Sequence, residues 1–340
     1  MSTRLPHGGP GENSVEAVPG TGLWITAQWV GIALTGALLT GLVMAPELSL
    51  DILWNAVIPV LPAVFMISPA LWRNVCPLAT LNTLSGRARG KVKTDGALAT
   101  AAQVVGIGLF FVMVPARRFV FNTDGLTLAV VIVVVAGLAL ALGFVFNSKA
   151  GFCNGVCPVL PVEKLYGQRP LIRLGNPRCQ PCVMCTGVGC MDRTPNDAVR
   201  QVLGAKADSK AWLLTPFGVF AGGFPGFVWG YFTLTDVPLA EAGAVYLHVL
   251  QWMAVSYTLT ALIVWVGNVS SEWMLRLLAV SALCLYYWYG SVGIADAWAL
   301  PDAFVYALRA AAIGLVVVWL GTSARGDTVE LAPSSASAGA

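Results

Sequence analysis

The chain has 340 residues, of which 57% are hydrophobic and only 11% are charged, and its formal net charge is +3. A soluble domain carries about 25% charged residues, so this composition excludes an ordinary soluble protein and indicates a polytopic protein embedded in a lipid bilayer. The small net charge does not suggest nucleic-acid binding. No Walker sequence and no G-x-G-x-x-G fingerprint after a strand is present, so directly bound ATP or NAD is not expected.

About eight apolar stretches are long enough to cross a hydrocarbon core of about 30 Å. The predicted fold class is therefore an all-α polytopic membrane protein. The segments 1–21 and 322–340 are rich in Gly, Pro, Ser and Ala, which predicts a disordered leader and a disordered tail. We expect transmembrane helices near 22–45, 52–72, 97–115, 125–147, 211–234, 243–267, 272–293 and 299–321.

The distribution of Lys and Arg predicts the orientation, because cytoplasmic loops carry an excess of these residues. Basic residues follow the second predicted span, and the loop 148–210 holds nine Lys and Arg against four acidic residues. We therefore expect both loops and both termini to be cytoplasmic, in a multi-pass protein of the bacterial inner (plasma) membrane. Arg117 and Arg118 fall on the predicted outer side, where they could mark a site for an anionic lipid or a partner.

Seven of the eight cysteines lie in short stretches that flank the apolar segments. Closely spaced thiolates of this kind are typical of iron–sulfur ligation, and bacterial ferredoxins use Cys-Pro to present the ligand of a neighbouring cluster. The eighth, Cys284, lies within an apolar helix, and we interpret it as a small buried hydrophobe. The candidate metal ligands are Cys179-x2-Cys182-x2-Cys185-x4-Cys190, Cys153-x3-Cys157-Pro158 and Cys76-Pro77.

The chain also repeats itself. Residues 75–86 align without gaps on residues 156–167, and each copy ends a pair of helices. The repeat predicts that Cys76 and Cys157 occupy related positions at the inner surface, while Trp72 stands where the second copy has Cys153. We accordingly divide the folded part into three regions, namely a duplicated helix-pair region at 22–147, a cytoplasmic iron–sulfur loop at 148–210 and a four-helix membrane region at 211–321.

Seven thiolates are one short of two all-cysteine [4Fe–4S] clusters, which leaves two arrangements open. In the first, the run from Cys179 to Cys190 holds one cluster, and Cys76, Cys153 and Cys157 hold a second with a non-cysteine ligand or a missing iron. In the second, Cys157 completes the set of Cys179, Cys182 and Cys185, while Cys190 joins Cys76 and Cys153. Zinc is the alternative, but it favours separated C-x2-C pairs. Haem is not expected, because His7 and His248 are the only histidines.

In these motifs the chain resembles the membrane polyferredoxins that include NapH, NosR and CcoG, over roughly residues 50–210. Those proteins carry C-x3-C-P elements at the ends of transmembrane helices and ferredoxin-type runs on the cytoplasmic side. The resemblance implies one or two [4Fe–4S] clusters and electron exchange with the quinone pool or a redox partner. In it, Cys153 and Cys157 match a C-x3-C-P element and Cys76 matches the second cysteine of the other element. The ferredoxin run is matched by Cys179, Cys182 and Cys185.

The predicted function is electron transfer between quinol and a partner protein, with a quinol dehydrogenase component as the corresponding enzyme class. The alternatives are a cluster-bearing cupric reductase or assembly factor, as in CcoG, or a redox sensor. A quinone needs an apolar slot with hydrogen-bond donors, and His248 and Arg309 are the candidate donors. Each also has a simpler interpretation, because His248 can be a hydrogen-bonded polar group within a bundle and Arg309 can extend to the outer interface.

Overall fold

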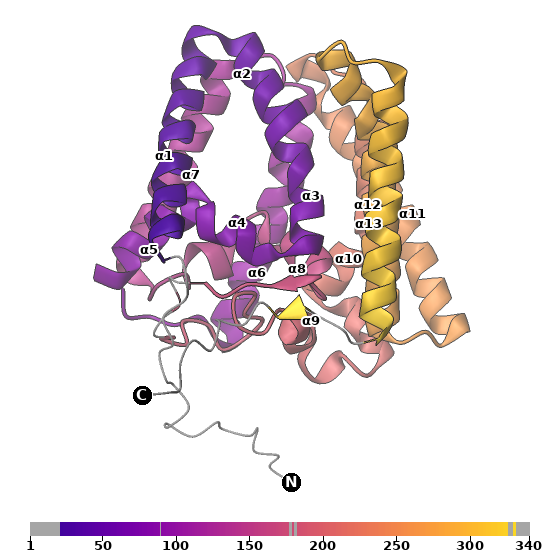
Figure 1. Cartoon of the computed structure of the whole chain (residues 1–340). Helices are drawn as coiled ribbons and strands as arrows, with labels where there is room; N and C mark the ends of the chain where they lie inside the picture. The colour runs from indigo at the N-terminus through magenta and orange to yellow at the C-terminus, as the bar shows by residue number, and fades with distance from the viewer. Residues whose placement is uncertain (1–20, 89, 177–178, 180–181, 326–328, 331–340) are drawn as a thin grey trace, which may run out of the picture.

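The computed structural model of the chain describes residues 21–88, 90–176, 179, 182–325 and 329–330. Residues 1–20 of the predicted disordered leader and most of the predicted tail lie outside these residues, whereas Thr21 and residues 322–325 are helical, which corrects the predicted boundaries. Within them the fold is helical, and two short strands, β1 (Ile172–Arg173) and β2 (Val329–Glu330), pair in parallel. Figure 1 shows the helices standing side by side, with the start of the first described helix and the end of the last one at the same end of the bundle.

Seven described segments are long and apolar enough to cross a membrane, which confirms an all-α multi-pass membrane protein. They contain α1 (Thr21–Met44), α2 (Pro46–Ile52) continuing into α3 (Ile58–Ile67), α6 (Gly96–Met113), α7 (Gly125–Val145), α11 (Ala242–Gly267), α12 (Ser271–Ala297) and α13 (Asp302–Arg325).

The second span begins and ends earlier than the predicted 52–72, and that prediction is corrected here. It starts at Pro46, passes through a π-helical turn at Leu53–Val57 and stops after Ile67. Ser68 is extended, with φ −165° and ψ 109°, because a residue that precedes proline avoids the helical region. The chain then turns into α4 (Pro69–Val75), which lies near the lower end of α1 and α3 in Figure 1.

The predicted span 211–234 corresponds to α10 (Pro216–Phe232), which is about 25 Å long. Beside its start, Lys210 Nζ donates to Trp265 O at the end of α11, and beyond its end Asp236 pairs with Arg118 at 3.1 Å. It therefore runs between the same two ends of the bundle as α11. Thirteen of its 17 residues are buried, so neighbouring helices rather than lipid cover most of α10.

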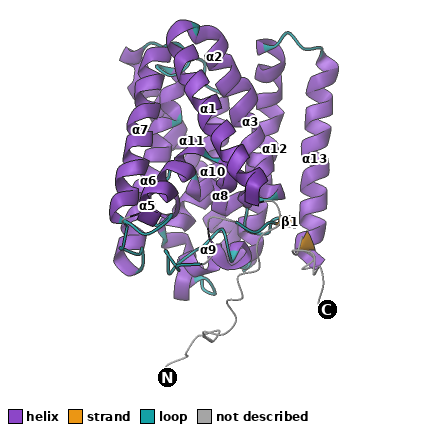
Figure 2. Ribbon diagram, turned by 60° about the vertical axis from the view of Figure 1, so that its left-hand side comes forward, coloured by secondary structure: helices purple, strands orange, loops and turns teal. Residues whose placement is uncertain are grey.

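The two halves of the chain form adjoining groups of helices. Helices α1 to α5 and α7 form one group, in which α5 (Pro77–Ala88) packs on α7, and helices α10 to α13 form the other, with α6 in contact with α10 (Figure 1). Figure 2 shows α13 at the edge of the second group, where it packs mainly against α12. The connecting region lies across the lower end of both groups and contains α8 (Leu160–Tyr166) and α9 (Pro195–Leu203).

The internal repeat has a structural counterpart. Cys76 separates α4 from α5, and Cys157 separates a π-helical turn (Phe152–Val156) from the turn that leads into α8. The two cysteines adopt nearly the same backbone conformation, with φ −55° and ψ 124° at Cys76 and φ −59° and ψ 122° at Cys157. The proline that follows each cysteine accounts for this extended geometry.

The two Cys-Pro elements pack against α1 and α6, and the position of their cysteines at the inner surface stays a prediction. A side-chain carbon at Gly31 of α1 would lie 2.8 Å from Val75 O, and one at Gly106 of α6 would lie 3.1 Å from Cys157 O. A side chain at Gly31 would force the backbone of Val75 to shift, and a side chain at Gly106 would fit only tightly. Both glycines lie ten residues from the start of their helices, which is about 15 Å at 1.5 Å per residue. The Cys-Pro elements are therefore recessed into the bundle.

Candidate metal centre

Three of the predicted ligands, Cys76, Cys153 and Cys157, belong to one apolar group within the first half of the bundle, and we call them the trio. They pack with Ala79, Ala139 and Phe152, and Cys153 is buried. Cys153 comes from the π-helical turn, and the other two cysteines each stand at the end of a helical segment.

The first turn after each Cys-Pro element directs backbone N–H groups at the cysteine. The backbone N–H groups of Leu78 and Ala79 lower the pKa of Cys76, and those of Val159 and Leu160 lower the pKa of Cys157, so both copies use the same two positions after the cysteine. The first N–H groups of a helix have no partner within the helix and favour a negative ligand. Burial outweighs this effect and raises the pKa of both thiols, that of Cys157 to about 12.

The other four predicted ligands, Cys179, Cys182, Cys185 and Cys190, line one hollow of about 240 Å³, and we call them the tetrad. The segment between Cys182 and Cys190 curves through two left-handed residues, Met184 at φ 46° and Gly189 at φ 68°. It is anchored to the neighbouring loop, since Thr94 N donates to Cys185 O. The hollow reaches the surface, because Met184 is 64% exposed.

Burial raises the pKa of the Cys179 thiol to about 12, and it also raises the pKa of Cys185. These two thiols therefore hold their protons when no metal is bound. A bound metal replaces the proton, so ligation at this site releases protons.

A network of buried charges lies beside the two cysteine sets. Arg73 of α4 contacts Glu163 at 2.8 Å and Asp192 at 2.8 Å, and Lys149 contacts Asp192 at 2.9 Å. All four side chains are at most 5% exposed. Burial alone would raise the pKa of Asp192, but the charges of Arg73 and Lys149 outweigh it and hold that pKa well below its usual range. The network joins α4, α8 and the loop that carries Cys190.

Asn154 connects the network to both cysteine sets. It lies in sequence between Cys153 and Cys157, and its Oδ1 accepts a hydrogen bond from Arg73 Nη2 at 2.7 Å. Its Nδ2 donates to Cys185 Sγ at 3.6 Å. The path from Cys153 Cα to Cys185 Sγ is at most about 11 Å long, because it consists of one α-carbon step of 3.8 Å, the Asn154 side chain and this contact.

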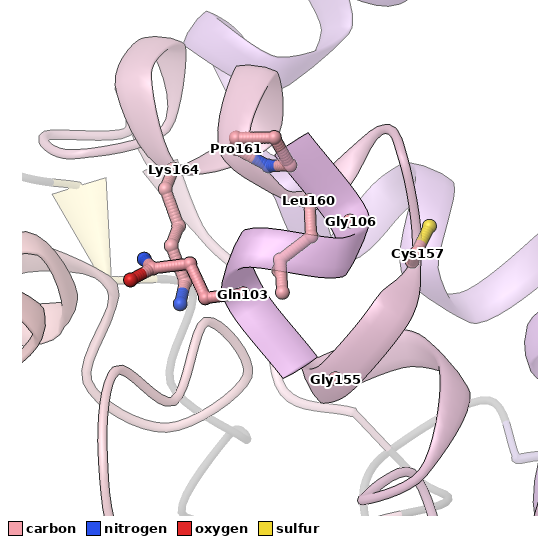
Figure 3. Close-up of a pocket in the computed structure, with 7 residues that line it drawn as sticks. All are labelled: Gln103, Gly106, Gly155, Cys157, Leu160, Pro161 and Lys164. Carbon is pink, nitrogen blue, oxygen red and sulfur yellow. The ribbon is translucent and has the colours of Figure 1, made fainter. Parts of the chain in front are cut away.

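Sequence reasoning did not identify Arg73, Asn154, Lys149, Asp192 or Lys164 as site residues. Lys164 is 4% exposed, and burial lowers its pKa to about 8. Its side chain extends toward Gln103 in the recess that Cys157 also lines (Figure 3). The only available signal was proximity in sequence, because Arg73 and Asn154 occupy aligned positions of the repeat, three residues before Cys76 and Cys157.

The described residues form no site for a single metal ion, and iron–sulfur ligation by the cysteines stays a prediction. Among the described residues, no three His, Cys, Asp or Glu side chains lie close enough to hold one metal ion. One zinc ion draws four sulfurs to about 2.3 Å, whereas each thiolate of a [4Fe–4S] cluster binds a different iron, which spreads the sulfurs further apart. Cys157 packs with the trio and does not line the hollow, and how the cysteines share the clusters stays a prediction.

The candidate quinone ligands have protein partners on different helices. His248 Nε2 lies 3.0 Å from Thr233 Oγ1 at the end of α10. Arg309 donates to Trp288 O at 2.7 Å and to Ser291 Oγ at 3.1 Å, and its guanidinium lies 4.2 Å from the centre of the Trp288 ring. A quinone site formed by His248 and Arg309 stays a prediction.

The other singled-out residues have structural partners. Arg117 donates to Asn122 Oδ1 at 2.7 Å, and Arg118 donates to Tyr231 O at 3.0 Å as well as pairing with Asp236. Arg118 thus joins the loop after α6 to the end of α10 and to the loop that follows it, while the hydrogen bond of Arg117 stays within its own loop. Cys284 is partly buried and packs against the main hydrophobic core, in agreement with its interpretation as a small hydrophobe.

Comparison with known proteins gave no relative for this chain. No protein-family model matches it, no curated protein sequence matches it, and no solved structure matches it.

Proposed function

We propose that this chain is an iron–sulfur electron-transfer protein of the bacterial inner membrane, similar to NapH, NosR and CcoG, that passes electrons between quinol and a redox partner protein. The observation that supports it is the gathering of the seven cysteines into a trio and a tetrad within a membrane helix bundle. The tetrad supplies four thiolates for one [4Fe–4S] cluster. The trio supplies three thiolates for a second cluster, whose fourth ligand is not cysteine.

The surroundings of the thiolates suit this role. Backbone N–H groups lower the cost of negative charge on Cys76 and Cys157, and the buried pairs of Arg73 and Lys149 keep the space beside the two sets electrically balanced. When bound, the clusters supply one-electron chemistry. The protein holds them by thiolates, shields the trio from water and adjusts the potentials through hydrogen bonds to sulfur.

The positions of the two sets favour a route from the bilayer to the surface. The trio is recessed by about 15 Å along the helices, where an apolar electron carrier such as quinol can approach. The tetrad borders an open hollow, where a partner protein can approach. The link through Asn154 keeps the two sets within the range over which electrons tunnel between protein cofactors.

A second candidate function, reduction of a cupric substrate, is favoured by one detail. Met184 is 64% exposed, and its N–H donates to Cys182 Sγ at 3.4 Å beside the hollow. Thioether and thiolate ligands select Cu(I). In this alternative, the tetrad would hold a cluster whose reduced form would supply the one electron that converts Cu²⁺ to Cu⁺ at the open side of the hollow.

Anaerobic purification of the full chain tests the proposal. We expect about four to eight irons per chain with matching acid-labile sulfide, together with electron paramagnetic resonance signals after reduction. Quinol should reduce the clusters under the proposed function, whereas reoxidation by Cu²⁺ with formation of Cu⁺ would favour the alternative. Stoichiometric zinc with no acid-labile sulfide would exclude both.

A further inference from the structure

Asn154 belongs to the element that carries two trio cysteines, yet its side chain serves the tetrad. Nδ2 lies 3.6 Å from Cys185 Sγ, within hydrogen-bonding distance for sulfur, and Oδ1 lies 2.7 Å from Arg73 Nη2. The side chain therefore spans the space between a buried guanidinium and a candidate cluster ligand.

The orientation of this amide is fixed by its neighbour. A guanidinium carries only donors, so it must face the carbonyl oxygen of the amide, and the NH2 group must then face the sulfur. Rotating the amide by 180° would place two donors against each other and remove both contacts. Arg73 is itself held by Glu163 and Asp192, so it cannot follow such a rotation.

The internal repeat explains how the pair arose. Arg73 and Asn154 stand at aligned positions, three residues before Cys76 and Cys157, and their side chains meet where the two copies face each other. One copy supplies the cation that orients the pair, and the other copy supplies the amide that donates to sulfur. The two copies therefore have different tasks at equivalent positions.

We propose that Asn154 is a positioning residue that raises the reduction potential of a cluster held by the tetrad, by donating a hydrogen bond to Cys185 Sγ in the orientation that Arg73 imposes. Reduction adds negative charge to the sulfur ligands, so a donor to sulfur favours the reduced state, and hydrogen bonds to sulfur are among the factors that set cluster potentials. The contact also directs electron flow toward the open hollow. This inference rests on the proposed iron–sulfur function.

The test is a redox titration of anaerobically purified full-length variants, followed by electron paramagnetic resonance, with iron and sulfide counted for each. The tetrad signal is identified as the one that Cys182→Ala removes. Asn154→Leu removes the donor, and we expect full iron content with a fall of up to about tenfold in the equilibrium constant for reduction, which equals about 59 mV for one electron. Asn154→Asp keeps an acceptor for Arg73 and directs a carboxylate oxygen at Cys185, so its potential should fall further.

Gln103→Leu is the matched control, because it removes an amide from the cavity that Asn154 and Lys164 also line. The tetrad potential should not change in this variant. An unchanged potential in Asn154→Leu at full iron content would overturn the proposal and leave the proposed function intact. Loss of tetrad iron in both Asn154 variants would also overturn it, because Asn154 would then act in assembly. Absence of acid-labile sulfide in the wild-type protein would instead overturn the proposed function.

Discussion

Replacing Arg73 by methionine should strongly destabilise the folded protein. The guanidinium donates to Glu163 at 2.8 Å, to Asp192 at 2.8 Å and 3.0 Å, and to Asn154 at 2.7 Å, and the side chain is 4% exposed. Methionine preserves much of the side-chain length and removes every one of these contacts. Glu163 then has no cationic partner at hydrogen-bonding distance among the described residues, whereas Asp192 keeps Lys149.

The magnitude follows from burial. Removing one partner of a buried ion pair costs about 3–5 kcal/mol, mainly because the remaining charge stays buried and uncompensated. Burial already raises the pKa of Glu163, and Arg73 opposes that effect. Without Arg73 the pKa of Glu163 rises further, so protonation at lower pH relieves the penalty. The stability difference between Arg73→Met and wild type should therefore be larger at pH 8 than at pH 6.

The assay is thermal unfolding in lipid nanodiscs, followed by tryptophan fluorescence, at both pH values. Arg169→Met is the control, because Arg169 pairs with Glu272 at 2.7 Å but the two side chains are 29% and 52% exposed, and an exposed pair contributes about 0–1 kcal/mol. The double variant Arg73→Met, Glu163→Gln should recover part of the loss. Equal melting temperatures for Arg73→Met and Arg169→Met would refute the reasoning, and so would a double variant that recovers none of the lost stability.

Three further predictions concern the ligands, the membrane orientation and the buried lysine. Cys182→Ala should lower the iron content by one cluster while Cys284→Ala leaves it unchanged, and equal iron loss in both would contradict the division of the cysteines. Reporter fusions at Lys206 should report the cytoplasm and fusions at Asp236 the outer side; the reverse pattern would invert the proposed route. Burial lowers the pKa of Lys164 to about 8, so this lysine is mostly protonated at pH 7, and Lys164→Met should lower the tetrad potential there; an unchanged potential would contradict this prediction.

Hydrophobicity alone determined the class of the protein and most of its helices. A membrane span must satisfy its backbone polar groups internally, so long apolar segments such as 125–147 have essentially one stable form, and the structure places α7 at Gly125–Val145. The second span was misplaced because proline can begin a helix as well as end one. Pro46 begins α2 and Pro69 begins α4, and the sequence pattern does not separate these roles.

Cysteine spacing identified the candidate ligands and the repeat but left two ways of sharing them between clusters. The division into trio and tetrad depends on contacts between residues far apart in sequence, such as Cys76 with Cys153. Spacing along the chain limits only the near neighbours of a ligand. The packing of the helices decides which distant helix end faces a given ligand.

Charges show most clearly what only the tertiary structure decided. Arg73, Lys149 and Lys164 count toward the basic loops that predict the orientation, yet all three are buried within the protein. A single sequence does not distinguish a lysine in water from a lysine beside a buried carboxylate, because the distinction depends on which segment covers it. The hydrogen bond from Asn154 to Cys185 likewise exists only because packing brings the two repeat copies and the tetrad loop together.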